Sequence, residues 1–175
     1  MDEDEQTRIA VRDAVIRQIE IAFDGVDRKF GVSLHEACVI DDYGSKWEQM
    51  KARMTDTEWR WQDVPEADIA RYFWILSFLD PIGFRYYMPA YMLFTLKNYL
   101  HTDSMSTDAT IYSLGLSDSF REHTMERFNL FTRPQSEATY AFPRFMANYS
   151  CGRADDDAAR KALEQYWGRF CLPMP

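Results

Sequence analysis

Residues 80–97 read Asp-Pro-Ile-Gly-Phe-Arg-Tyr-Tyr-Met-Pro-Ala-Tyr-Met-Leu-Phe-Thr-Leu-Lys, and this stretch decides the fold class of the 175-residue chain. Asp80 is placed to cap a helix whose first position is Pro81, where the missing backbone donor costs nothing. The helix that follows is apolar on nearly every face and has no carboxylate before Asp103. A helix of this kind belongs in the middle of a fold. Pro89 is expected to kink it or to split it in two.

The segments on either side also carry helical signals, so the predicted fold class is all-α. Apolar residues recur at helical spacing, and capping residues mark the expected starts. Capping boxes are expected at residues 119–122 and 132–135. Residues 57–61 alternate as a strand would, but no comparable run is present to pair with them, and an extended linker is expected there. These signals predict a bundle with helices over about residues 7–23, 33–40, 46–54, 63–78, 119–131, 132–149 and 155–170 around the central one.

Length and charge distribution predict one domain with a short tail. A chain of this length fits a single domain. The 12 Phe, 10 Tyr and 5 Trp against 7 Gly and 7 Pro favour helices packed through aromatic rings. The formal net charge is −8, and the N-terminal run Asp2, Glu3, Asp4 and Glu5 supplies half of it. Residues 1–6 are therefore expected to form an acidic disordered tail, and residues 7–175 a single helical domain.

The charge balance also limits the partners of the protein. A phosphate backbone or an anionic membrane surface attracts clustered Lys and Arg, which this chain lacks. Nucleic acid and membranes are therefore not expected as partners. A partner protein with a basic surface would be compatible with the net negative charge of the chain. The sequence leaves the oligomeric state open.

The cysteines and the N-terminus favour the cytoplasm. Cys38, Cys151 and Cys171 are widely spaced, which suits neither a disulfide framework nor a paired zinc site. The N-terminus is acidic where a secretory signal would be basic and then apolar. The longest uncharged apolar stretch, residues 86–96, is too short to span a bilayer.

Catalytic motifs are missing from the sequence, which favours a non-enzymatic role without a cofactor. There is no Gly-rich phosphate loop, no Gly-x-Ser-x-Gly, no His-Glu-x-x-His and no Cys-x-x-Cys. His35 and Cys38 share a helix face and suggest either metal ligands, with Asp41 and Asp42, or a thiol with its base. Turn and capping chemistry explains the two aspartates equally well. No metal site is predicted.

Arg85 suggests an alternative function, the binding of a small ligand. A charged side chain inside an apolar helix must be paired, either with another residue or with a ligand. A structural partner would be Asp80 or an acid from residues 58–68. A functional explanation is that Arg85 binds a small anion, either in a binding protein or in an enzyme. The pocket would then be lined by the neighbouring tyrosines, Tyr86, Tyr87 and Tyr91.

Residues 61–65 (Trp-Gln-Asp-Val-Pro) and 76–92 resemble a family of uncharacterised bacterial proteins. The resemblance rests on Phe-Leu-Asp-Pro, Gly-Phe-Arg-Tyr-Tyr and Pro-Ala-Tyr-Met within residues 78–92, and on Asp-Asp-Tyr-Gly at residues 41–44. It extends over most of the chain after about residue 15. It implies a bacterial source and a domain of unknown function, and it carries no activity.

Taken together, these features predict a non-enzymatic cytoplasmic interaction protein. One form of this function is an immunity-type protein that neutralises a basic toxin domain, since acidity would speed the encounter. The alternatives are the anion pocket around Arg85 and a structural subunit. The tryptophans near the acidic residues fit either a docking surface or a lid over the core. The predicted docking residues are Asp41, Asp42, Glu58, Trp59, Trp61 and Asp63.

Overall fold

The computed structural model describes residues 3–171 and shows an all-α fold, with no strand among these residues. Short 3-10 segments lie at Trp61–Asp63, Ile75–Ser77, Asp118–Phe120 and Trp167–Phe170. The predicted fold class is confirmed. The nine helices of the described part are α1 (Glu3–Ala22), α2 (Leu34–Asp41), α3 (Lys46–Arg53), α4 (Glu66–Arg71), α5 (Pro81–Asn98), α6 (Ser106–Ser113), α7 (Arg121–Asn129), α8 (Arg133–Tyr149) and α9 (Asp156–Gln165).

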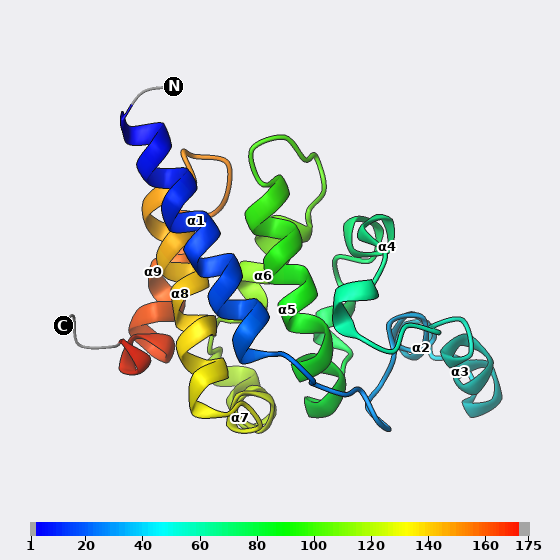
Figure 1. The fold of residues 1–175 in the computed structure, drawn as a ribbon. Helices are drawn as coiled ribbons and strands as arrows, with labels where there is room; N and C mark the ends of the chain where they lie inside the picture. Colours follow the sequence, from blue (N-terminus) through cyan, green and yellow to red (C-terminus); the bar gives the residue numbers. More distant parts are fainter. Residues whose placement is uncertain (1–2, 172–175) are drawn as a thin grey trace.

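The helices are arranged around α5, which runs through the middle of the molecule (Figure 1). On one side α1 packs along α8, and α8 packs along α9. On the other side lie α4 and then α2 and α3, which pack against each other at one end of the molecule (Figure 1). This arrangement leaves α3 at the periphery, with α2 as its main neighbour.

Helix α5 is the buried central helix that its sequence predicts. Asp80 caps it, since its Oδ1 accepts a hydrogen bond from the Gly83 amide at 2.8 Å. Thirteen residues of α5, including Phe84 and Tyr91, are buried. The helix is not split at Pro89, which is itself buried. Packing on nearly every side compensates for the backbone donor that Pro89 lacks.

The loop before α2 lies flat against the first turn of α5, because two glycines allow a close approach. A Cβ on Gly83 would lie 2.4 Å from the Val32 carbonyl oxygen, and one on Gly31 would lie 2.5 Å from the Gly83 nitrogen. The Asp80 carboxylate also accepts from the Val32 amide at 2.8 Å. One side chain therefore caps α5 and fixes the loop that carries residues 24–32.

Part of the predicted N-terminal tail is helical. Residues 3–6, expected to be disordered, lie in α1. Three acidic residues in the first turn interact favourably with the positive end of the helix dipole, which explains why an acidic run is helical here. Met1 and Asp2 lie outside the described residues, as do residues 172–175 of the expected domain.

The helix predicted over residues 63–78 is wrong as a single element. Helix α4 ends at Arg71, and Tyr72 leaves helical geometry with φ −99° and ψ 53°. The Tyr72 carbonyl instead accepts a hydrogen bond from the Tyr91 hydroxyl at 2.7 Å. A contact from the central helix therefore replaces the local helical pattern, and only the 3-10 turn at Ile75–Ser77 follows.

Of the two predicted capping boxes, one is confirmed. The Thr132 hydroxyl accepts from the Gln135 amide at 3.4 Å, and the Gln135 side chain accepts from the Thr132 amide at 3.1 Å. The box expected at Ser119 is wrong, because Ser119 lies in a 3-10 turn and α7 begins after Phe120 without a side-chain cap.

Candidate functional site

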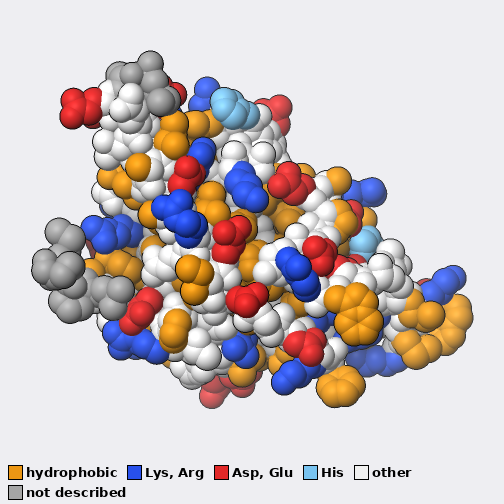
Figure 2. Space-filling model, viewed as in Figure 1, with side chains coloured by type: hydrophobic (Ala, Val, Ile, Leu, Met, Phe, Trp, Pro, Cys, Tyr) orange, Lys and Arg blue, Asp and Glu red, His pale blue; other side chains and the backbone are white. Residues whose placement is uncertain are grey.

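The end of the molecule formed by α2 and α3 exposes a group of large apolar side chains, which we call the aromatic face. It consists of Phe30, Tyr43, Trp47, Met50, Met54 and Trp59. Their exposed fractions run from 57% to 97%. Figure 2 shows hydrophobic side chains gathered over this end, with Lys and Arg beside them.

Helix α3 presents its apolar stripe to solvent. Trp47, Met50 and Met54 are spaced three and four residues apart, so they share one side of the helix. The Ser45 hydroxyl caps the helix by accepting from the Glu48 amide, and the Glu48 carboxylate accepts from the Ser45 amide at 2.8 Å. An amphipathic helix normally buries such a stripe. Helix α3, which is described throughout, contributes no residue to the buried core.

Arg53 ties the loop that carries Phe30 to α3. Its guanidinium donates to the Gly31 carbonyl at 2.7 Å, to the Lys29 carbonyl at 2.9 Å and to the Glu36 carboxylate at 2.8 Å. Phe30 lies between the two carbonyls that Arg53 holds, and its side chain is 93% exposed. The backbone of an exposed aromatic residue is thus fixed in place.

The aromatic face includes a residue in an unfavourable backbone conformation. Tyr43 follows α2 with a φ of 56°, in the left-handed region that residues with a Cβ rarely adopt. Its side chain is 97% exposed. Strained residues of this kind persist where the surrounding structure imposes them, and they concentrate at functional sites.

A buried polar network holds the linker that carries Trp59. The Arg28 guanidinium pairs with the Glu58 carboxylate at 2.8 Å and donates to the Asp56 carbonyl at 2.9 Å. The Tyr87 hydroxyl donates to the same Glu58 oxygen at 2.7 Å. Burial, together with the Asp56 and Glu58 carboxylates, holds the pKa of Tyr87 well above its ordinary value. The hydroxyl therefore stays protonated as a donor.

The predicted docking residues separate into surface and interior groups. Asp42, Trp59 and Asp63 are exposed, and Asp41 is half-buried at the end of α2. Trp61 is only 1% exposed. Its indole N–H donates to the Phe23 carbonyl at 2.8 Å.

Two of the six residues therefore stabilise the fold instead of facing solvent. Trp61 belongs to the core, which corrects the prediction that it docks a partner. The Glu58 side chain, 9% exposed, is used by the buried network. Sequence reasoning missed the aromatic face residues Phe30, Tyr43 and the α3 stripe. The 47/50/54 spacing was the available signal, but spacing does not tell whether a stripe faces the core or solvent.

His35 and Cys38 do not form the pair suggested by their spacing. The His35 Nδ1 lies 2.6 Å from a carboxylate oxygen of Asp56. The Cys38 thiol donates to the Leu34 carbonyl at 3.5 Å, and burial with three nearby carboxylates raises its pKa to about 11. Within residues 3–171, no group of three or more His, Cys, Asp or Glu side chains is arranged to hold a metal ion.

Arg85 and the three tyrosines are not brought together in one pocket. The Tyr86 and Tyr87 hydroxyls reach the Glu58 segment, and the Tyr91 hydroxyl reaches Tyr72. Arg85 lines a separate hollow of about 310 Å³ beside the loop before α2. The expected pairing of Arg85 with Asp80 or with an acid from residues 58–68 is also wrong. Arg85 makes no ion pair within the described residues, and its Nε donates to the Gln135 side chain at 2.9 Å.

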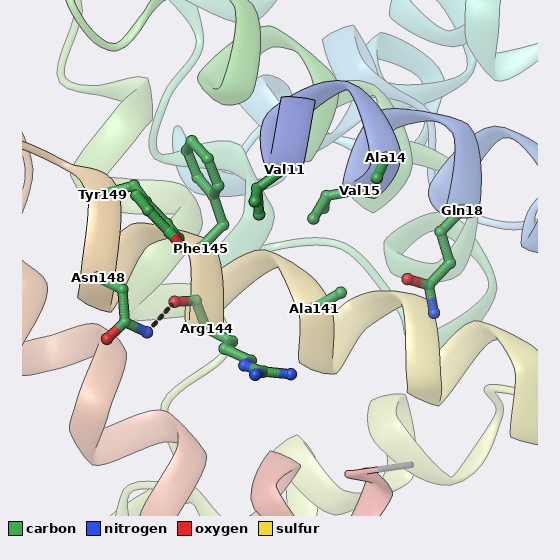
Figure 3. Close-up of a pocket in the computed structure, with 9 residues that line it drawn as sticks. All are labelled: Val11, Ala14, Val15, Gln18, Ala141, Arg144, Phe145, Asn148 and Tyr149. Carbon is green, nitrogen blue, oxygen red and sulfur yellow. Dashed lines mark hydrogen bonds between the residues drawn. The ribbon is translucent and has the colours of Figure 1, made fainter. Parts of the chain in front are cut away.

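A second hollow, of about 670 Å³, lies between α1 and α8 (Figure 3). Val11 and Val15 of α1 line one wall, and Phe145 lies in the opposite wall on α8. Its polar side chains include Arg144 and Asn148, whose amide donates to the Arg144 carbonyl at 2.7 Å. The polar groups do not converge on one point, so this groove is a weaker candidate for a ligand site than the Arg85 hollow.

The comparisons with known proteins identify a family and no activity. The model of a family of unknown function, DUF6714, matches residues 11–170. No curated protein and no solved structure matches the chain. Among the described residues, no helix has the length and apolar character needed to cross a membrane.

Proposed function

Because the chain belongs to DUF6714, a family of unknown function, its role must be inferred from its own surface, and we propose that it is a non-enzymatic interaction protein that docks a partner protein through the aromatic face. The observation that carries this proposal is the α3 stripe, with Trp47 at 64%, Met50 at 57% and Met54 at 75% exposure. Large exposed apolar side chains gathered in one region of a surface are typical of interaction sites.

The residue types of the aromatic face suit a protein interface. Tryptophan and tyrosine are enriched at the residues that carry most of the binding energy, and methionine adapts to irregular partners. Trp59 and Tyr43 have rigid side chains with few rotatable bonds, so ordering them on binding costs little entropy. Asp42 and Lys46 beside them are exposed and supply a polar rim.

A basic partner, such as the toxin domain of an immunity pair, is supported by the charge of the remainder of the chain. Residues 28–60 contain six Lys or Arg and six Asp or Glu, so this end is neutral. The remaining fourteen basic and twenty-two acidic residues carry the whole charge of −8. We propose that this charge attracts the partner at long range and that the neutral aromatic face makes the contact.

A bacterial cytoplasm is the setting that we propose. The resemblance of residues 78–92 to uncharacterised bacterial proteins supports the source. Cys38 and Cys151 form no disulfide within the described residues, which fits a reducing compartment.

Site-specific photo-crosslinking in cells that naturally express the chain tests the proposal. Benzoylphenylalanine replaces Trp47 in one variant and Phe120 in a control, because Phe120 is 67% exposed and lies before α7, away from the aromatic face. We expect one protein to be crosslinked at position 47 and not at position 120. Equal crosslinking at both positions would contradict the proposal.

The crosslinked protein is then purified and its affinity measured. We expect Trp47→Ala to weaken binding by about 2 kcal/mol or more, as central interface tryptophans do. The same variant should change the free energy of unfolding by less than about 0.5 kcal/mol, because the side chain is exposed. If the crosslinked protein is a second copy of the chain, the aromatic face forms a homodimer, and the proposed partner is wrong.

A further inference from the structure

The hollow beside Arg85 is formed where three parts of the fold meet. The loop of residues 24–29 supplies one wall, the first turns of α5 supply the second, and the junction between α7 and α8 supplies the third. The close approach of Gly31 and Gly83 holds the loop near α5. Gly25 and Lys29 adopt positive φ angles of 68° and 48°, so the loop has a defined shape.

Arg85 is held through its Nε, which leaves the two terminal nitrogens of its guanidinium group for a ligand. Its Nε donates to the side-chain oxygen of Gln135, which is 3% exposed and fixed by its own bond to the Thr132 amide. Within the described residues, no carboxylate pairs with the two terminal nitrogens of Arg85. Those two nitrogens form the pair that binds a carboxylate with two parallel hydrogen bonds.

The charged groups of the hollow are balanced. Asp24 and Asp27 line it together with Lys29 and Arg85. One Asp27 oxygen accepts from the Lys29 amide at 2.8 Å, while the Asp24 side chain has no hydrogen bond or ion pair within the described residues. A simple anion would be attracted by two cations and repelled by two carboxylates. A ligand that carries both charges would gain from both pairs.

Aliphatic side chains complete the hollow. Ile82 is 36% exposed and Leu130 is 38% exposed, and both line the cavity with Val26. A cavity of about 310 Å³ is at the small end of ligand pockets, so it suits a small molecule with an apolar portion.

We infer that this hollow binds a free aliphatic α-amino acid. Its carboxylate lies against Arg85, its ammonium group lies against Asp24 and Asp27, and its side chain contacts Ile82 and Leu130. This site is separate from the aromatic face and does not depend on the proposed docking function.

Calorimetric titration of the full chain with four compounds tests the inference. The compounds are L-leucine, N-acetyl-L-leucine, which lacks the ammonium group, L-leucinamide, which lacks the carboxylate, and inorganic phosphate. We expect L-leucine to bind and each of the others to bind at least about tenfold more weakly, because one charged contact is lost.

Variants assign the binding to the hollow. Arg85→Gln and Asp24→Asn should each weaken L-leucine binding about tenfold. The Asp24 substitution leaves folding unaffected, since the side chain is exposed and has no hydrogen bond or ion pair to lose within the described residues. Arg144→Gln, in the exposed groove of α8, should leave binding unchanged and serves as the control. The inference is overturned if phosphate or N-acetyl-L-leucine binds as tightly as L-leucine, if Asp24→Asn has no effect, or if no amino acid binds at millimolar concentration.

Discussion

Tyr87 joins three segments of the chain through one hydroxyl. It donates to Glu58, accepts from the Leu34 amide at 3.2 Å and accepts from Arg28. Tyr87→Phe would leave a buried carboxylate and a buried amide with one partner fewer. We expect a loss of about 1–3 kcal/mol in the free energy of unfolding, measured by urea denaturation. Tyr43→Phe, which removes a hydroxyl at a 97% exposed position, should lose almost nothing. Equal losses would mean that the buried network contributes no stability.

Cys38 is expected to be a slow nucleophile. Its pKa of about 11, raised by burial and by the Asp56, Asp42 and Asp41 carboxylates, leaves about one thiolate in a thousand at pH 8. The rate of alkylation by iodoacetamide should rise about tenfold per pH unit up to about pH 10, because only the thiolate reacts. Exposed Cys151 in the same sample provides the comparison, and peptide mass spectrometry measures both. A fast, pH-independent rate at neutral pH would restore the hypothesis of a thiol activated by His35.

Sequence patterns predict an element well when its environment resembles the average one, and poorly when a distant contact decides it. The start of α8 follows from Thr132, which is a local capping signal. Helix α6 was not predicted, because its buried positions include Ser106 and Thr110 in place of an apolar stripe. Their hydroxyls donate to backbone carbonyls at 2.6 Å, to Ile69 and Ser106 respectively.

The candidate site also shows that sequence patterns do not reveal the effect of a distant contact. Trp59 and Trp61 are two residues apart and chemically identical, yet one is 91% exposed and the other 1% exposed. The difference comes from the Phe23 carbonyl, which lies 38 residues away in the chain and accepts from the Trp61 indole. Arg85 was expected to pair with an acid, but its partner is Gln135, which is 50 residues away, and no local spacing indicates it.

The close approach at the start of α5 gives a prediction for that element. Alanine normally stabilises a helix interior relative to glycine by about 1 kcal/mol. At Gly83 the added Cβ would meet the Val32 carbonyl at 2.4 Å and the Asp80 carboxylate at 2.9 Å. Gly83→Ala should therefore destabilise the protein, by about 1–3 kcal/mol in thermal or urea unfolding.

A second glycine provides the comparison for Gly83→Ala. Gly115→Ala, whose Cβ would meet only the Tyr112 carbonyl oxygen within 4 Å, at 3.2 Å, should cost less. A stabilising effect of Gly83→Ala would show that the loop of residues 24–32 moves freely from α5. The Arg85 hollow would then lack the fixed wall on which its ligand specificity depends.

At the scale of the whole molecule, the net charge and the aromatic face belong to different parts of the chain. The charge of −8 belongs to the residues outside the neutral segment 28–60, which carries the aromatic face. Long-range attraction of a basic partner is an effect on the association rate, whereas apolar contact sets the dissociation rate. Raising the salt concentration should therefore slow association with the partner and leave dissociation nearly unchanged.

Charge reversal at two places separates local from global steering. Asp41 and Asp42 lie beside Tyr43 on the aromatic face, while Glu122 and Glu126 lie on α7, which is well apart from α2 and α3 (Figure 1). Charges farther apart than about 8 Å are largely screened at physiological salt. Lysine at both Asp41 and Asp42 should slow association with a basic partner in stopped-flow measurements more than lysine at both Glu122 and Glu126 does, because the first pair lies nearest the contact. Equal effects would mean that only net charge matters. Faster association of the Asp41 and Asp42 variant would mean that the partner has an acidic rim, and a basic toxin domain would then be excluded as the partner.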